Sequence, residues 1–226
     1  MSPVTSRKTS RRTLAVGVAA GLVLGVPAAV AATRIAPPKP TEFVRVLPPG
    51  ENPMIADGVA LGKNVDTYKS SGLGPAGTNS LAPGGTQERY IDTSIFPGGS
   101  LPAGVSITEA QGLSVLKRID ANLAAVGLDV EDVTSMRVFL AAPDGSDIAD
   151  FNGWNRAYRQ YFANKKIPSG EVIPVPLGSA PPKAPMVANS ARPSRFVVEV
   201  ANLPVSGWLV EVEVDAVYPS GGSGKK

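Results

Sequence analysis

The spacing of apolar residues changes several times along the chain, and each change predicts a different element. From Ser106 to Gly127 the apolar positions recur every three or four residues, which is typical of a helix that buries one face. Ser106 and Glu109 have the spacing of a capping box at the helix start, and Gly127 is a typical stop signal. Residues 133–140 then alternate between apolar and polar positions and predict a strand.

A second helix is predicted over residues 147–163. Aromatic residues lie along one stripe of it, and we interpret them as core residues that pack against a sheet: Phe151, Trp154, Tyr158 and Phe162. Asn155 lies beside this stripe, where it fits either a capping amide or a surface amide.

Two further strands are predicted near the end of the chain, over residues 196–201 and 209–217. The second alternates strictly between apolar and acidic residues, as a half-buried strand does. The segment between them contains Pro204 and Gly207, so we expect a turn that makes the two strands antiparallel hairpin partners.

The N-terminal half has weaker strand patterns. Residues 42–47 fit a short edge strand, and residues 58–72 fit either two strands or one broken strand. Together with the later elements, this order predicts an α+β domain with both helices on one face of a mixed sheet.

The segments outside the predicted domain at 54–218 differ from it in composition. Residues 1–31 combine four basic residues with an apolar run, and they predict a signal peptide of the twin-arginine type. Localisation is therefore expected to be secreted or extracytoplasmic, with a retained N-terminal anchor as the alternative. A proline-rich leader at 32–53 precedes the domain, and a Gly- and Ser-rich tail at 219–226 follows it.

Two insertions rich in glycine and proline interrupt the domain, near 74–105 and 167–192. The first is expected to be partly ordered over the domain surface, because a loop of this length is either functional or disordered. The second is expected to be extended and exposed.

The chain has neither cysteine nor histidine, which excludes disulfides, thiolate nucleophiles, Ser-His-Asp triads and zinc sites built from those residues. We expect no metal and no cofactor. Without residues 1–31 the formal charge falls from +3 to −1. A chain of nearly neutral charge has no electrostatic footprint for nucleic acid, and after signal removal no stable membrane span is expected.

Arg195 stands just before the predicted strand at 196–201. A guanidinium held on a stiff element can bind a carboxylate through two parallel hydrogen bonds. The structural alternative is that Arg195 caps the strand or pairs with a surface acid such as Glu199. The local pattern alone leaves both interpretations open.

Motifs in two blocks, about 106–162 and 192–217, occur in a specific order. They are Gln111, Gly127-Leu128-Asp129-Val130-Glu131-Asp132-Val133, Arg137-Val138-Phe139-Leu140, Phe151-Asn152-Gly153-Trp154-Asn155-Arg156-Ala157-Tyr158, Tyr161-Phe162, Pro193-Ser194-Arg195, Val200-Ala201-Asn202-Leu203-Pro204 and Val210-Glu211-Val212-Glu213. In this order the motifs resemble the YjgF/RidA family.

The resemblance implies a chorismate-mutase-like fold that assembles as a homotrimer with clefts between subunits. It implies that Arg195 binds the carboxylate of a small substrate and that Glu211 positions water or a proton. Asn155 matches the asparagine of the family's second helix, and Ser71 with Gly72 matches the serine-glycine turn after an early strand. One departure stands out, since the family's Gly-Pro-Tyr stretch corresponds to residues 54–58, which contain no tyrosine.

The resemblance thus favours an exported, cofactor-independent deaminase that hydrolyses imines or enamines of small amino-acid-derived carboxylates to 2-keto acids and ammonia. An imine carbon is already electrophilic, so the protein needs to anchor the carboxylate and orient water. The alternative is a non-catalytic module that binds small ligands or proteins on the same trimeric scaffold. RNA cleavage, proposed for some family members, is disfavoured by the charge and by the absence of histidine.

Overall fold

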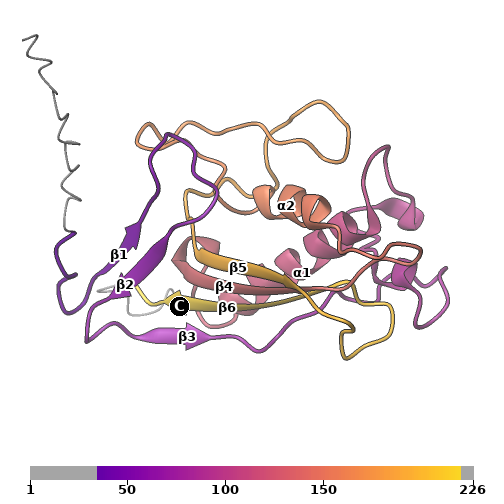
Figure 1. Ribbon diagram of the computed structural model, residues 1–226, viewed down its shortest axis with the longest axis horizontal. Helices are drawn as coiled ribbons and strands as arrows, with labels where there is room; N and C mark the ends of the chain where they lie inside the picture. The colour runs from indigo at the N-terminus through magenta and orange to yellow at the C-terminus, as the bar shows by residue number, and fades with distance from the viewer. Residues whose placement is uncertain (1–34, 220–226) are drawn as a thin grey trace, which may run out of the picture. The chain divides into compact units, whose positions relative to one another are not determined.

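The computed structural model describes residues 35–219, which form a four-stranded mixed sheet of order β3-β6-β4-β5. β6 pairs antiparallel with β3 and with β4, whereas β5 pairs parallel with β4. The strands are β3 (Thr67–Lys69), β4 (Val133–Leu140), β5 (Ser194–Glu199) and β6 (Val210–Val217). Helices α1 (Ile107–Ala124) and α2 (Phe151–Arg159) pack on each other and on one face of the sheet (Figure 1). The predicted α+β fold is confirmed.

The alternation along the central strands gives the sheet two different faces. In β6 the apolar residues are buried and the acidic residues between them are half-buried. Because successive side chains of a strand point to opposite faces, the apolar set meets the helices and the acidic set lies on the other side. We call that second side the open face; its side chains are Lys69, Arg137, Phe139, Phe196, Val198, Glu211, Glu213 and Asp215.

The predicted hairpin between the last two strands is wrong. β4 lies between β5 and β6, and β5 runs parallel to β4 instead of antiparallel to β6. The segment between β5 and β6 therefore crosses the end of β4, where Ala141 N donates to Leu209 O. Turn residues fix where the chain reverses, but they carry no information about a third strand that inserts between the two.

Both helices begin at side-chain caps. Ser106 Oγ accepts a hydrogen bond from Glu109 N, as predicted for α1, but the Glu109 carboxylate does not complete the capping box. It is fully buried and accepts instead from Arg156 Nε at 2.8 Å and from Gly178 N at 3.0 Å. α2 is shorter than predicted, because Asp150 caps it through Gly153 N.

Both insertions pack more closely on the domain than predicted. The first carries the short 3-10 helices η1 (Gln87–Tyr90) and η2 (Pro97–Gly99) and packs on the core through Ile91 and Phe96, so it is ordered. A third 3-10 helix, η3 (Val130–Asp132), lies outside the insertions and precedes β4. The second insertion runs over α2 in Figure 1, and Val187 N donates to Gln160 O. It was predicted as extended and exposed, but Asn189, Ala191 and Arg192 at its end are buried.

The leader contributes a separate two-stranded sheet. β1 (Phe43–Val46) pairs antiparallel with β2 (Gly58–Leu61), so the 58–72 region contains two strands that belong to different sheets. Arg45 Nη2 joins this hairpin to the domain by donating to Glu131 O and Val133 O, each at 2.9 Å. In residues 35–219 no helix is long and apolar enough to cross a membrane. The predicted signal at 1–31 lies outside the described residues.

Candidate functional site

Arg195 lies on the helix side of the sheet, at the edge strand β5. Its register partner on β4 is Met136, which is fully buried beneath the helices. The Arg195 guanidinium lies over the ring of Tyr158 at 4.3 Å from the ring centre, and Nη2 donates to Asn155 Oδ1 at 2.9 Å. Both partners come from α2, one turn apart. Arg195 and Asn155, which were each predicted as substrate-binding residues, therefore lie in direct contact, and Arg195 forms no ion pair with Glu199.

Two hydrogen-bond donors of Arg195 have no partner among residues 35–219. Nε and Nη1 are buried and form no hydrogen bond. Burial lowers the pKa of Arg195, yet a guanidinium stays charged at any physiological pH. Buried polar groups are nearly always satisfied, so each exception needs an explanation. A carboxylate binds a guanidinium along an edge that includes Nη2, so one that accepts from Nη1 and from the second N–H of Nη2 would supply a missing bond and leave the bond to Asn155 in place.

Positive charge gathers around Arg195 without balancing acids. Arg159 and Arg192 lie near the same tyrosine, Tyr158, and burial lowers the pKa of both arginines. Among residues 35–219, none of these three arginines forms an ion pair with a carboxylate. Arg159 and Arg192 donate to backbone carbonyls and to Asn52 instead. The charge of this region favours an anionic ligand.

Glu211, Ser71 and Gly72 form a second group, on the open face. Glu211 pairs with Phe139 in the register of β6 and β4, and its neighbours Val210 and Val212 are buried on the opposite side. A Cβ atom at Gly72 would lie 2.1 Å from Glu211 Oε1, so the carboxylate rests directly against the Gly72 backbone. Only glycine allows this approach. Ser71 is exposed beside it.

The structure thus brings the predicted site residues together in two groups and does not join them. Arg195 and Asn155 lie on the helix side, whereas Glu211, Ser71 and Gly72 lie on the open face. The predicted hairpin would have placed Arg195 and Glu211 on partner strands. Instead, β4 separates their strands within one chain, and their side chains leave opposite faces of the sheet.

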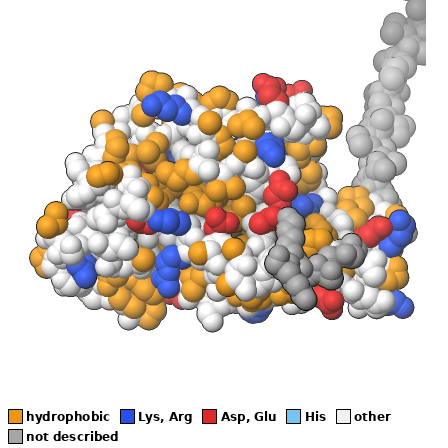
Figure 2. Space-filling view, turned by 180° about the vertical axis from the view of Figure 1, so that it is seen from behind, with side chains coloured by type: hydrophobic (Ala, Val, Ile, Leu, Met, Phe, Trp, Pro, Cys, Tyr) orange, Lys and Arg blue, Asp and Glu red, His pale blue; other side chains and the backbone are white. Residues whose placement is uncertain are grey.

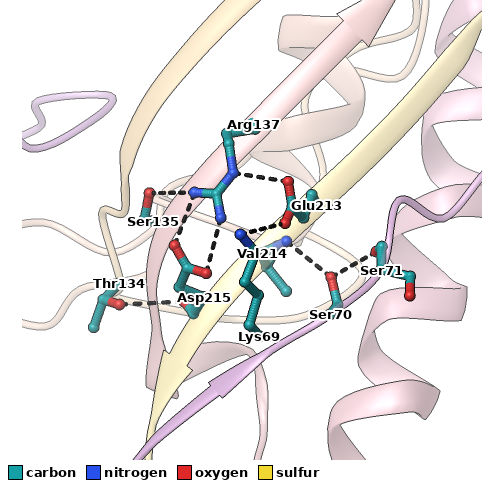
Figure 3. Close-up of polar contacts among 9 residues, drawn as sticks. All are labelled: Lys69, Ser70, Ser71, Thr134, Ser135, Arg137, Glu213, Val214 and Asp215. Carbon is teal, nitrogen blue, oxygen red and sulfur yellow. Dashed lines mark hydrogen bonds and ion pairs between the residues drawn. The ribbon is translucent and has the colours of Figure 1, made fainter.

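An ion cluster occupies the open face next to Glu211 (Figure 3). Arg137 Nε donates to Glu213 Oε2 at 2.8 Å, and its Nη1 and Nη2 donate to the two oxygens of Asp215 at 2.8 and 2.9 Å. Lys69 Nζ lies 3.0 Å from Glu213 Oε1. These bonds raise the pKa of Arg137 and lower that of Glu213 to about 2.

The ion cluster is expected to make stability depend on acid pH. The folded-state pKa of Glu213 lies below its ordinary value of 4.5, so its contribution is present above about pH 4.5 and is lost as the pH falls towards 2. Thermal unfolding between pH 7 and pH 2 should show a falling Tm over this window, and the fall should be smaller in Glu213→Gln. Equal falls in both proteins would mean that Glu213 does not carry the dependence.

Apolar side chains lie beside the ion cluster on the open face. Phe196 is 49% exposed and Val198 39% exposed, and the Phe196 ring meets Phe139 edge-on at 6.2 Å between ring centres. Exposed apolar groups bordered by charges are typical of a surface that another protein covers. On the face drawn in Figure 2, Lys and Arg side chains are interspersed with acidic and hydrophobic ones instead of forming a continuous basic stripe.

Sequence reasoning missed three residues around Arg195. Tyr158 was interpreted as a core residue, and it is one, but its ring also supports the guanidinium. Met54 Sδ lies 3.7 Å from Arg195 Nη2, and the only available signal was its place where the family has Gly-Pro-Tyr. Arg192 is fully buried, and no local pattern indicates that. Within the described residues, no group of three or more His, Cys, Asp or Glu side chains could hold a metal ion.

Comparison with known proteins gives a family and several similar solved structures. A family model described as Endoribonuclease L-PSP matches residues 98–218, more than half of the 226-residue chain. Among solved structures, the chain is 25% identical to E. coli TdcF with bound serine, with 75% of this chain and 92% of that chain covered and a TM-score of 0.39. It is also 25% identical to the E. coli YjgF gene product, with 72% and 86% covered and a TM-score of 0.38.

A third solved structure is NMB1025 from Neisseria meningitidis, a member of the YjgF protein family. The chain is 19% identical to it, with 79% of this chain and 96% of that chain covered and a TM-score of 0.36. No curated protein matches the chain.

Proposed function

Because this chain belongs to the endoribonuclease L-PSP family, the family that its YjgF/RidA motifs indicate, we propose that it binds small imines or enamines bearing a carboxylate and hydrolyses them to 2-keto acids and ammonia. The observation that carries the proposal is the pair of buried, unsatisfied donors on Arg195. The proposal concerns the domain within residues 35–219. Export stays a prediction from the sequence.

The reaction needs few protein groups. Arg195 would hold the substrate carboxylate through Nη1 and the second N–H of Nη2, with Asn155 fixing the guanidinium orientation through the first N–H of Nη2. Water adds to the imine carbon and its proton passes to the nitrogen. The resulting amino alcohol then breaks its C–N bond, so ammonia leaves and a keto group remains. Glu211 would orient the water and carry protons between these steps, as a positioned carboxylate can.

We also propose that the site is completed by a second subunit. Arg195 and Glu211 lie on opposite sides of the sheet, so one chain cannot place both around a small molecule. A homotrimer would bring the Glu211 group of one subunit to the Arg195 group of the next, and the family resemblance implies a homotrimer with clefts between subunits. The exposed Phe196 and Val198 give the open face apolar surface to bury in such an assembly.

A complementation experiment tests the proposal. Wild type should release ammonia and 2-keto acid from an imine generated in situ, whereas Arg195→Ala and Glu211→Gln should each be inactive. After the two variants are unfolded and refolded together in equal amounts, each mixed trimer has one intact site, so about a quarter of wild-type activity should return. Light scattering checks that trimers form. Inactive wild type contradicts the reaction, and an inactive mixture of trimers contradicts the shared site.

The alternative is a non-catalytic ligand-binding protein on the same scaffold. It is favoured by the position of Glu211 on the opposite side of the sheet, since Arg195 alone can bind a carboxylate but supplies no group that carries protons. Under this alternative, small carboxylates bind and Arg195→Ala abolishes binding, while ammonia release equals that of buffer. The family description names an endoribonuclease, but nearly neutral charge outside residues 1–31 and the lack of histidine give no support to RNA cleavage here.

A further inference from the structure

The leader passes directly over Arg195. We call residues 51–56 the leader strap. Its backbone is held at successive positions: Arg192 Nε donates to Pro53 O at 2.7 Å, Tyr158 Oη donates to Met54 O at 2.9 Å, and Ala56 N donates to Pro193 O at 3.4 Å. Ala56 also forms a parallel bridge with Ser194, next to Arg195. The strap backbone is therefore fixed against the edge of the sheet.

The side chain of Met54 is held much less firmly than its backbone. Its thioether sulfur lies 3.7 Å from Arg195 Nη2, and the residue is only partly buried. An unbranched methionine side chain rearranges at low energetic cost. The other groups on the guanidinium are fixed: Tyr158 is fully buried and stacks on Phe162 at 5.3 Å between ring centres, and Asn155 is hydrogen-bonded to Arg195.

Both edges of the guanidinium at which a carboxylate can accept two parallel hydrogen bonds include Nη2, so a carboxylate that binds Arg195 in this way must displace the Met54 sulfur that lies against Nη2. Of the three side chains in contact with the guanidinium, Met54 can move without breaking a strong hydrogen bond. We propose that Met54 is the gate and the specificity-determining residue of this anchor, and that it selects carboxylates with an apolar substituent. This inference rests on the proposed role of Arg195 as a carboxylate anchor.

The preference follows from what surrounds the ligand once Met54 has moved. Its methylenes and sulfur remain beside the carboxylate site, because the strap backbone stays bonded to Tyr158 and Arg192. An apolar group on the ligand loses water there and gains contact with Met54. A charged or hydroxyl group would lose its hydration without a new partner. The selected class is therefore 2-imino and 2-keto acids with aliphatic side chains.

Binding of stable 2-keto acids tests the gate without relying on hydrolysis. Calorimetry with the full chain should give wild type at least roughly tenfold higher affinity for 4-methyl-2-oxopentanoate than for pyruvate, and weaker binding of 2-oxoglutarate. Met54→Ala should bind pyruvate more tightly than wild type does and should lose most of the preference. Met54→Leu should keep it. Met186→Ala, an exposed methionine in the second insertion, is the matched control and should behave as wild type.

The possible outcomes distinguish failure of the proposed role of Met54 from failure of the proposed hydrolysis. Equal preference in wild type and Met54→Ala contradicts the gate while leaving the anchor intact. Failure of every acid to bind either protein contradicts both the gate and the anchor. A changed preference without any ammonia release supports the gate and contradicts the proposed hydrolysis. If Met54→Ala does not fold, Met54→Gln serves instead, since it keeps the length of the side chain and should also weaken the apolar preference.

Discussion

Replacing Arg195 by alanine is expected to lower kcat/KM for imine hydrolysis by about a hundredfold or more. The reason is that the substrate carboxylate loses a charged, bidentate hydrogen-bond donor in a site that is shielded from water. The carboxylate is bound alike in the ground state and in the transition state, so much of the loss should appear in KM. Arg195→Lys keeps the charge but not the planar fork, and its loss should be intermediate, about tenfold. Steady-state kinetics on all three proteins measure this.

A control for Arg195 is available in the first insertion. Arg89 is half-buried and its guanidinium donates to Asn79 O, with no described bond to Arg195 or its partners, so Arg89→Ala should keep wild-type kinetics. If Arg195→Ala and Arg89→Ala have the same kcat/KM, Arg195 is not the anchor. Binding of 2-keto acids should fail in Arg195→Ala as well, which separates loss of the anchor from loss of a chemical step.

Replacing Arg192 by methionine is expected to lower the free energy of unfolding by about 3–5 kcal/mol. Arg192 is fully buried and donates to three carbonyls, those of Pro53, Lys165 and Ser190, at 2.6 to 2.7 Å. Methionine fills much of the same volume but satisfies none of these acceptors, and each buried acceptor left without a donor is costly. Urea unfolding of wild type and Arg192→Met measures the difference.

Replacing Arg192 should affect the stability of the fold more than it affects the binding of carboxylates. Arg192→Lys can satisfy at most some of the carbonyls, so its stability should lie between those of wild type and Arg192→Met. A loss below about 1 kcal/mol in Arg192→Met would show that the leader strap does not depend on this residue. Under stabilising conditions, both variants should still bind carboxylates through Arg195, more weakly because Met54 and its strap are less well placed.

The sequence pattern was sufficient to predict those elements that are determined by neighbouring residues in the chain. The periodicity of α1 and the strict alternation in β6 determine which side is buried, the serine cap determines where α1 begins, and the structure confirms all three. The same alternation placed Arg195 at the start of a strand, although that strand begins at Ser194 and ends at Glu199 instead of spanning 196–201. The family motifs then singled out Asn155, whose contact with Arg195 no periodicity would reveal.

The failures share a physical cause, which is that long-range pairing leaves no local trace. The insertion of β4 between β5 and β6 depends on sheet pairing between distant segments, so a turn between the last two strands was mistaken for a hairpin. The leader strap depends on hydrogen bonds to backbone carbonyls, which every residue type presents equally. For the same reason, the proline-rich composition of residues 167–192 did not reveal that its end is buried.

The leader strap also has a consequence for how this chain acquires its structure. The bond between Arg192 and Pro53 joins residues 139 positions apart in the sequence. At a ribosomal rate of about 5–20 residues per second, the strap leaves the ribosome roughly 7–28 s before its partner. Contacts of such sequence separation form late and slowly. We therefore expect the central sheet and helices to assemble first, and the arginine anchor to become covered only in the final stage of folding.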